Sequence, residues 1–401
     1  MVRFAPTSLN ELRDAVATAL AAEEPLEVLG GGSKRGLGRP LQTPHVLDVS
    51  NLSGIVDYEP NELVLTARAG TPMGEIERVL GEHNQMLAFE PPDWRGLLGS
   101  AGEPTLGGAL ACNLSGPRRF KAGAARDHFL GFRGVSGRGE IFKAGGKVVK
   151  NVTGYDLCKL MAGSYGTLAV LEEVTVKVLP RPEASETLLF ADIEPGAAIR
   201  LMSAALGSPH EVSAAAYLPS GSVLPSGPSA SGLVALRVEG PAPSVVARCD
   251  SLAREHGSPE ALAGAASLEF WAAIGEAEPL GSVPDKAVWR VSVAPARGAE
   301  VAEAIGNALE IKWFLDWGGG LLWLAAPDAD DGGEAVIRAA IRGADGRGTG
   351  HATLVKGSAG LRREVPVFEP QPAPLAALSR RVKEAFDPAH ILNPGRMIDG
   401  I

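Results

Sequence analysis

The segment Leu26-Glu-Val-Leu-Gly-Gly-Gly-Ser-Lys-Arg-Gly36 is a short apolar strand that runs directly into consecutive glycines. Glycine has no Cβ and adopts φ > 0, so several backbone N–H groups of such a loop can turn toward one point. This arrangement suits a pyrophosphate, to which Ser33 adds a hydroxyl and Lys34 a positive charge. The alternative is a flexible turn between two strands. The segment therefore predicts a phosphate-binding loop at the end of a strand, or a plain turn.

Two further glycine-rich regions strengthen the first interpretation. One is Thr105-Leu-Gly-Gly-Ala-Leu-Ala-Cys-Asn-Leu-Ser-Gly-Pro117, and the other is Lys150-Asn-Val-Thr-Gly-Tyr-Asp156 with Ala162-Gly-Ser-Tyr-Gly-Thr-Leu-Ala-Val170. Small residues in this pattern let backbone pass close to a flat ring system or a phosphate. The chain has no G-x-G-x-x-G, and Val148 follows Gly145-Gly-Lys147, so the usual dinucleotide and P-loop signatures are missing. Neither NAD nor ATP is favoured.

The order of these loops resembles the FAD domain of the vanillyl-alcohol-oxidase / p-cresol-methylhydroxylase (PCMH-type) family. The family's pyrophosphate loop corresponds to residues 30–36, its flavin-contacting segments to residues 105–116, 154–156 and 163–170, and its terminal N-P-G-[RK] to residues 393–396. The resemblance implies that these loops together bind FAD. The FAD-binding residues that it implies are Gly30, Gly31, Gly32, Ser33, Lys34, Gly36, Pro91, Thr105, Leu106, Gly107, Gly108, Asn113, Ser115, Gly116, Gly154, Tyr155, Asp156, Gly166, Thr167, Leu168, Val170 and Asn393.

Within this family the chain is similar to the FAD-binding E subunits of bacterial glycolate oxidases. The similarity lies in residues 114–119, 126–131, 147–156, 316–323 and 350–354. It implies a complex that oxidises glycolate, a small 2-hydroxy acid, to glyoxylate. In such a complex a D subunit of the same fold also holds FAD, and an F subunit holds iron–sulfur clusters that receive the electrons.

Departures from the family pattern narrow this expectation. Members that attach FAD covalently place a histidine in the first glycine loop, where this chain has Ser33 and Lys34, so we expect non-covalent FAD. Catalytic relatives that act on 2-hydroxy acids carry a G-D-G-N-x-H segment in the cap, often with a metal. The nearest analogue here is Gly350-His351, with a single histidine. The three cysteines form no C-x-x-C pair and the histidines lack metal spacing, so no metal is expected.

Candidate catalytic groups follow from what a flavin dehydrogenase must do, which is to remove a proton and hold the substrate carboxylate. His351 is the candidate base, and Arg396 or Lys356 is the candidate carboxylate clamp. A structural role is the alternative for His351. Three functions remain open. The first is a FAD subunit that relays electrons. The second is a self-sufficient FAD-dependent oxidase or dehydrogenase of a small hydroxy acid or alcohol, and the third is a flavin-fold scaffold without redox turnover.

The bulk properties exclude several classes of protein. The net charge of −9 gives no electrostatic reason to bind nucleic acid. The longest apolar run, near residues 321–326, is far shorter than the roughly 20 residues of a membrane span, so no transmembrane segment is expected. The start Met1-Val-Arg-Phe-Ala-Pro6 has no apolar signal region. We expect a cytoplasmic protein, with any membrane association made through partner subunits.

The pattern of elements predicts a mixed α/β (α+β) architecture. A PCMH-type FAD-binding domain is expected at 1–180, with subdomains at about 1–87 and 88–180, an α+β cap with an antiparallel sheet at 183–365, and a C-terminal segment at 366–401 that returns to the FAD domain. The first subdomain is expected to hold a small parallel or mixed sheet, and the second glycine-rich loops between short strands. In the cap, strands are expected at 187–191, 214–218, 233–238, 288–293, 311–315, 321–324 and 351–355, and helices at 197–206, 243–256, 299–309 and 334–341.

Overall fold

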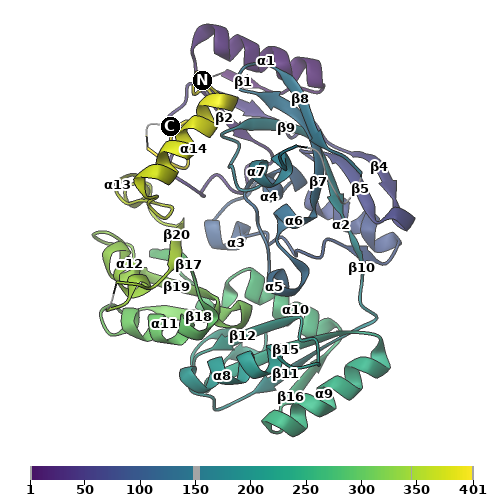
Figure 1. Ribbon diagram of the computed structural model, residues 1–401, viewed down its shortest axis with the longest axis vertical. Coiled ribbons are helices and arrows are strands. Elements are labelled where there is room, and N and C mark those ends of the chain that lie inside the picture. The colour runs from purple at the N-terminus through teal and green to yellow at the C-terminus, as the bar shows by residue number, and fades with distance from the viewer. Residues whose placement is uncertain (1, 148–153, 345, 400–401) are drawn as a thin grey trace. The chain divides into compact units, whose positions relative to one another are not determined.

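The computed structural model describes residues 2–147, 154–344 and 346–399 (Figure 1). Contacts divide the chain into two compact units. The first, called here the FAD-pocket unit, comprises Met1–Ser115, Gly123–Arg181 and Pro370–Ile401. The second, called the eight-strand unit, comprises Gly116–Ala122 and Pro182–Glu369. The expected mixture of helices with antiparallel sheet is confirmed, and each unit is described below by itself.

A three-stranded parallel sheet begins the FAD-pocket unit. Its order is β1 (Val2–Phe4), β3 (His45–Asp48) and β2 (Leu26–Leu29). Helix α1 (Leu9–Ala22) starts at Ser8, whose hydroxyl accepts a hydrogen bond from the Glu11 N–H at 3.3 Å. The helix buries Leu12 and Val16 against Leu26 and Leu47 in one apolar cluster. This packing fixes β2, whose last residue leads into the first glycine loop.

The same unit holds a five-stranded antiparallel sheet. Its order is β4 (Ile55–Glu59), β5 (Val64–Arg68), β9 (Ala169–Lys177), β7 (Phe129–Ser136) and β8 (Ile141–Gly145). The pair β6 (Gln85–Met86) and β10 (Leu179–Pro180) lies apart from it. Helices α2 (Met73–Glu82), α4 (Leu106–Ala111) and α7 (Leu157–Met161) contribute buried side chains to the core of this sheet. Val135 of β7 and Val170 of β9 belong instead to the apolar cluster formed by α1 and the three-stranded sheet, so the cores of the two sheets are continuous.

The structure corrects one expectation for residues 88–178. We expected loops between strands there, and the structure has five short helices: α3 (Arg95–Leu98), α4, α5 (Arg119–Ala122), α6 (Ala125–His128) and α7. The reason at α4 is tertiary, since glycines disfavour helix in isolation. Thr105 caps the helix, and Gly107 lies so close to Ala69 that a Cβ would come within 2.7 Å of it. Residues 148–153, which belong to the third glycine-rich region, lie outside the described residues.

The last segment of the chain returns to the first sheet. A turn follows helix α14 (Ala373–Phe386). Beyond this turn, Leu392 forms a parallel bridge with Leu26 of β2. The Leu26 N–H donates to the Ile391 carbonyl at 2.7 Å, and the Asn393 N–H donates to the Leu26 carbonyl at 3.0 Å. Residues 391–393 therefore extend the parallel sheet along the free side of β2.

The eight-strand unit is built on one antiparallel sheet. Its order is β16 (Glu260–Ala263), β11 (Ala184–Phe190), β15 (Leu233–Gly240), β12 (Ala214–Leu218), β18 (Lys312–Asp316), β19 (Leu321–Pro327), β17 (Lys286–Val293) and β20 (Gly350–Lys356). The two-residue strands β13 (Val223–Leu224) and β14 (Gly227–Pro228) form a hairpin. Each expected cap strand overlaps one of these strands.

The two faces of this sheet differ. One face forms a continuous core with α8 (Pro195–Leu206), α9 (Ala242–His256), α11 (Gly298–Gly306) and α12 (Glu334–Arg342). On the other face α10 (Ala265–Gly275) covers the β11 end, where the Trp271 indole N–H donates to the Thr187 hydroxyl at 2.8 Å. Helix α13 (Leu361–Glu364) completes the unit. The second face at the β17–β20 end carries polar side chains, described below.

Candidate functional site

A cavity of about 290 Å³ opens in the FAD-pocket unit. Its walls come from segments far apart in sequence: the end of β2 with its glycine loop, α2, residues 91–95, residues 103–112 around α4, residues 165–171, and two residues of the C-terminal segment. The volume is close to the lower end of the usual range for small-molecule sites, roughly 300–1,000 Å³. Six separate stretches of chain thus have to be held together for the cavity to exist.

The glycine loop after β2 packs directly on the backbone of a second loop. A Cβ at Gly31 would lie 1.9 Å from the Glu103 carbonyl oxygen, and one at Gly102 would lie 2.0 Å from the Gly31 carbonyl oxygen. A Cβ at Gly30 would come within 2.6 Å of the Thr105 hydroxyl. These three glycines are therefore required by contact between the two loops. For Gly31, packing of one backbone on the other is thus a reason of its own for the absence of a side chain.

Other pocket glycines face open space. Gly32 has φ +80°, and a Cβ there would meet nothing nearer than the Arg35 Cδ at 3.8 Å. A Cβ at Gly74, on α2, would have no neighbour within 4 Å. At Gly108 the nearest atom would be the Thr105 hydroxyl oxygen, at 3.2 Å. These positions leave room for a ligand to approach the backbone of the loop, α2 and the first turn of α4.

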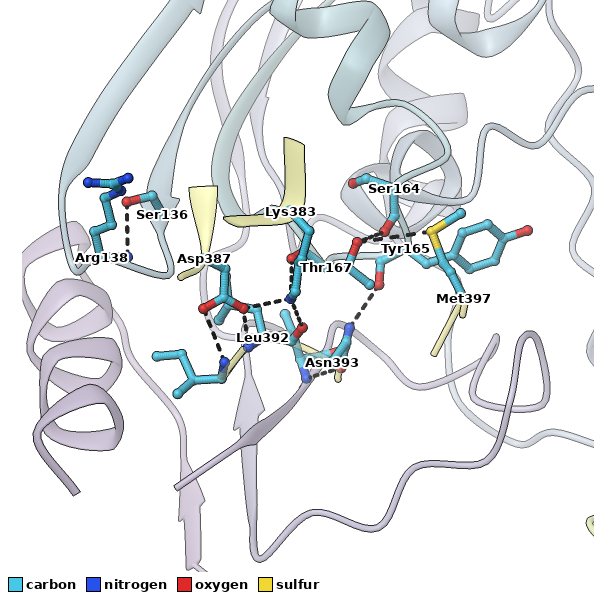
Figure 2. Close-up of polar contacts among 12 residues, drawn as sticks. Ser136, Arg138, Ser164, Tyr165, Thr167, Lys383, Asp387, Leu392, Asn393 and Met397 are labelled. Atoms are coloured by element: carbon cyan, nitrogen blue, oxygen red, sulfur yellow. Dashed lines mark hydrogen bonds and ion pairs between the residues drawn. The ribbon is translucent and has the colours of Figure 1, made fainter. Parts of the chain in front are cut away.

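One side chain links three walls of the cavity (Figure 2). The Asn393 carboxamide oxygen accepts a hydrogen bond from the Val28 N–H at 2.8 Å, and its nitrogen donates to the Tyr165 carbonyl at 2.8 Å. The Tyr165 N–H in turn donates to the Ala111 carbonyl at the end of α4, at 2.9 Å. Asn393 has φ 44°, a conformation that asparagine tolerates better than most residues. It thus joins β2 and the 163–166 loop through the C-terminal segment.

A buried ion pair holds the turn that carries Asn393 (Figure 2). The Lys383 ammonium donates to the Asp387 carboxylate at 2.6 Å, to the Thr167 carbonyl at 2.8 Å and to the Leu392 carbonyl at 2.9 Å. All three of its N–H donors are therefore used. Asp387 also accepts from the Ile391 and Leu392 N–H groups, at 3.0 and 2.8 Å. Burial lowers the pKa of Lys383, although Asp387 opposes the shift.

Arg396 lies in the cavity wall but is directed into the protein. Its guanidinium donates to the Arg35 and Leu37 carbonyls, both at 3.1 Å, and to the Glu27 carboxylate at 3.3 Å. The same carboxylate binds the Arg35 side chain. Burial lowers the pKa of Arg396, and Glu27 opposes the shift. These contacts tie the C-terminal segment to the glycine loop, which is a different geometry from a carboxylate clamp open to substrate.

The structure distributes the sequence-derived candidates between the cavity wall and positions outside it. The candidates in the wall are Gly30, Gly31, Gly32, Ser33, Lys34, Pro91, Thr105, Gly107, Gly108, Gly166, Val170, Asn393 and Arg396. The candidates outside it are Gly36, Leu106, Asn113, Ser115, Gly116, Gly154, Tyr155, Asp156, Thr167, Leu168 and His351. Several of the second group support the wall instead. For example, the Asn113 side chain accepts from the Arg126 N–H at 3.1 Å, and Asp156 caps α7. Tyr155 is 91% exposed.

Sequence reasoning missed part of the wall. Gly74 and Glu77 of α2 and Glu103 line the cavity without belonging to any recognised motif. The bridge between Pro72 and Thr105 brings α2 to the cavity, and only tertiary structure reveals it. Cys112 also lines the wall, and burial raises the pKa of its thiol to about 11. No sequence signal distinguished these residues from ordinary packing positions.

His351 and Lys356 lie in the eight-strand unit, on β20. The Lys356 ammonium donates to the Val283 carbonyl at 2.7 Å. Partial burial lowers the pKa of His351, and the positive charges of Arg290 and Arg119 lower it further, while Glu369 opposes them. A lowered pKa favours the neutral imidazole, which can accept a proton. Among the described residues, no cluster of His, Cys, Asp or Glu has the geometry of a metal site.

The cavity fits FAD by three features of its own. Backbone is exposed at Gly32, Gly74 and Gly108, where a Cβ would point into space or touch only a hydroxyl. Lys34 and Arg95 bring positive charge to the wall, which suits a pyrophosphate. The wall also contains apolar side chains such as Val170 and Ala109, which suit a flat ring.

Comparison with known proteins decides the family. The model of the FAD-binding domain family matches residues 2–145. The chain is 37% identical over 387 residues to glycolate oxidase subunit GlcE of Escherichia coli, and the alignment covers 96% of each chain. This chain belongs to the GlcE family of FAD-binding proteins. Its FAD-binding character and its place among the oxidoreductases of CH–OH donors follow from that membership.

More distant matches agree with this GlcE-family assignment. Glycolate oxidase subunit GlcD of Bacillus subtilis is 31% identical over 46% of this chain and 38% of its own length. Two solved structures share the fold. The 4-ethylphenol oxidase from Gulosibacter chungangensis has a TM-score of 0.71 at 15% identity, over 99% of this chain and 89% of that one. p-Cresol methylhydroxylase has a TM-score of 0.71 at 13% identity, over 99% of this chain and 88% of that one. The PCMH-type fold expected from the sequence is thereby confirmed.

In the described part of the chain, no helix has the length and apolarity needed to span a membrane.

Proposed function

We propose that this GlcE-family chain is the FAD-binding subunit of a complex that oxidises glycolate, or a similar small 2-hydroxy acid, to the corresponding 2-oxo acid. The supporting observation is the 37% identity to subunit GlcE across 96% of both chains. In the proposed complex a D-type subunit of related sequence holds a second FAD, and an F-type subunit holds iron–sulfur clusters that take the electrons. The similarity to GlcD supports the first partner. We further propose a cytoplasmic complex whose contact with a membrane is made by partner subunits.

Some residues of this chain would bind FAD, and others would take part in the reaction. When bound, FAD supplies the acceptor for the hydride that leaves the alcohol carbon. Gly32, Ser33 and Lys34 would hold the pyrophosphate, with Gly74 and Gly108 giving access to backbone. Asn393 would keep β2 and the 163–166 loop in register around the ring. His351, whose lowered pKa favours the neutral imidazole, would accept the hydroxyl proton of the substrate.

A second candidate is a self-sufficient dehydrogenase. It is favoured by the D-2-hydroxyglutarate dehydrogenase of Xanthomonas citri, which is 30% identical to this chain over 46% of this chain and 38% of its own length. The single histidine of the 350–354 segment disfavours it, since such enzymes are expected to carry a richer set of cap histidines. A scaffold without redox turnover is the third possibility.

Purification and anaerobic reduction separate these functions. The full-length chain is purified alone and together with D-type and F-type subunits from the same host, and flavin content, iron content and visible spectra are measured. We expect FAD to be released into the supernatant by acid precipitation, because it is not covalently attached. We also expect iron–sulfur absorption to copurify with this chain, and glycolate to bleach the flavin of the complex.

The outcomes are distinct. Flavin that is bleached by glycolate in the isolated chain would overturn the relay function in favour of the self-sufficient enzyme. A colourless chain that still assembles with its partners would support the scaffold. Flavin that remains with the acid precipitate would contradict non-covalent binding.

A further inference from the structure

Two arginines of the eight-strand unit stack on one tryptophan. The guanidinium carbon of Arg119 lies 4.4 Å from the centroid of the Trp317 ring, and that of Arg290 lies 4.8 Å from it. The Trp317 indole N–H donates to the Gly116 carbonyl at 3.1 Å, so the ring is anchored to the segment that carries Arg119. Arg119 comes from residues 116–122 and Arg290 from β17, which are far apart in the sequence. Both cations therefore lie against the same indole ring.

Strand register places further polar groups beside Arg290. Arg290 pairs with Thr353 on β20, and Ser292 pairs with His351. Cross-strand partners, and residues two apart on a strand, share one face of a sheet. All four side chains are partly or fully exposed, whereas Trp289, Val291, Ala352 and Leu354 of the opposite face lie in the core. We call Arg119, Arg290, Ser292, His351 and Thr353 the arginine row.

Electrostatics in the arginine row favours an anion. The positive charges of Arg290 and Arg119 both help to lower the pKa of His351. Two acidic groups border the row. Glu369 raises the pKa of His351 but also forms an ion pair with Arg338 and accepts from the Ala352 N–H at 3.0 Å. Asp316 is buried and accepts from the Trp317 N–H at 2.7 Å.

The stacked geometry also suits recognition of a planar anion. Guanidinium stacks through its face, while its N–H donors lie in its plane and match the two oxygens of a carboxylate. The neighbouring Arg118 is used differently, because it forms a buried ion pair with Glu239. Arg118, which precedes α5, thus contacts an internal carboxylate, whereas Arg119, the first residue of α5, contacts an indole at the edge of the polar row.

We propose that Arg119 and Arg290 bind the carboxylate of a small 2-hydroxy acid on this face of the sheet, with Ser292 and Thr353 beside its polar end. The class of ligand rests on the proposed function. The site itself lies wholly within the eight-strand unit and assigns Arg290 and Arg119 the anchoring role that the sequence had suggested for Arg396 or Lys356. Trp317 acts as the positioning residue that fixes both guanidinium groups.

Binding of glycolate to the FAD-loaded full-length chain tests the proposal. Titration calorimetry and tryptophan fluorescence are recorded with glycolate and with glycolamide, its uncharged analogue, at physiological salt. We expect glycolamide to bind at least about tenfold more weakly, because it cannot form charge-assisted bonds. Arg290→Gln and Arg119→Gln should each weaken glycolate binding at least about tenfold. Lys121→Gln is the matched control, since Lys121 lies on the same short helix and its ammonium is 3.5 Å from surface Glu211.

Two additions make each result decisive. Arg290→Lys keeps the charge but loses the planar fork, so partial recovery relative to Arg290→Gln is expected, and circular dichroism checks that every variant is folded. Trp317→Phe should abolish the fluorescence response. Equal binding of glycolate and glycolamide, or unchanged affinity in folded Arg290→Gln and Arg119→Gln, would overturn the site. FAD content and assembly with partner subunits are measured on the same samples, so a chain that binds FAD and partners but no glycolate refutes the site and leaves the proposed function standing.

Discussion

The FAD cavity and the arginine row are built in opposite ways. The cavity wall is assembled from six separated stretches that touch through glycine backbone and through buried polar groups such as Lys383 and Asn393. Apart from Arg119 of α5, the arginine row consists of alternate residues on β17 and β20, supported by a continuous apolar core on the opposite face. A change in a cavity contact should therefore alter folding and FAD binding together. A change in the row should alter ligand binding while the sheet remains intact.

The largest effect is expected from Lys383→Met. The substitution keeps most of the side-chain volume but leaves the Asp387 carboxylate, which is fully buried, without its cation. Breaking a buried pair in this way costs about 3–5 kcal/mol of unfolding free energy. Urea unfolding of the two proteins measures the difference. Lys121→Met, at an exposed pair, should cost little, and a similar loss in both variants would show that the buried pair has no special role.

The pH dependence of that difference has a definite sign. The pKa of Lys383 is lowered in the folded state from its ordinary 10.5, so between the two values the unfolded chain holds a proton that the folded chain has lost. Unfolding then takes up a proton, and this group's contribution makes stability rise with pH in that window. We expect the difference in unfolding free energy between the wild type and Lys383→Met to increase as pH approaches 10.5 from below. A difference that decreases would contradict the shift.

Gly31→Ala should have the next largest effect. The new Cβ would lie 1.9 Å from the Glu103 carbonyl oxygen, so the two loops must separate, at a cost of about 3 kcal/mol and with loss of FAD. Gly108→Ala should be much milder, because its Cβ would meet only the Thr105 hydroxyl at 3.2 Å. Flavin content after desalting and thermal unfolding measure both effects. Gly96→Ala, with no atom within 4 Å, is the control. Equal losses at 31 and 108 would mean that contact with FAD, not loop packing, selects both glycines.

This difference between glycines shows what the sequence could and could not predict. Strand β12, whose five residues are all buried, was located residue for residue, because a short continuous apolar run is a local signal. The helix α4 was missed because its stability comes from the Thr105 cap and from packing of Gly107 on Ala69. The glycine loops predicted a flavin site, but the roles of the single glycines depend on which backbone lies opposite. No sequence motif singles out Arg290, and only strand register and tertiary contact place it beside Thr353 and Trp317.

Asn393→Ala should have a smaller effect than Lys383→Met or Gly31→Ala. It removes hydrogen bonds to the Val28 N–H and the Tyr165 carbonyl, and it places alanine at φ 44°. We expect a loss of about 2 kcal/mol and weaker FAD binding, because one buried donor and one buried acceptor lose their partner. Asn393→Asp keeps the acceptor for Val28 but buries a carboxylate against the Tyr165 carbonyl oxygen, so at neutral pH it should lose at least as much stability as Asn393→Ala. Equilibrium titration with FAD and denaturant unfolding give both quantities. Unchanged flavin affinity in Asn393→Ala would remove this residue from the site.

The smallest effect on stability, and the most local test of the cavity, concerns Cys112. Its thiol lines the wall, and burial raises its pKa to about 11, with Lys34 and Arg396 opposing the shift. Only the thiolate reacts with iodoacetamide, so alkylation at pH 8 should be slow and should accelerate with rising pH in the manner of a group that titrates near 11. FAD should slow the reaction further by covering the wall, while Cys158 and Cys249, both buried in cores, stay unmodified in either state. Mass spectrometry of tryptic peptides gives the three rates separately. Cys112 that reacts equally fast with and without bound FAD would show that the flavin lies elsewhere, whereas protection confined to Cys112 would tie the cofactor to this cavity without any change to the residues that hold it together.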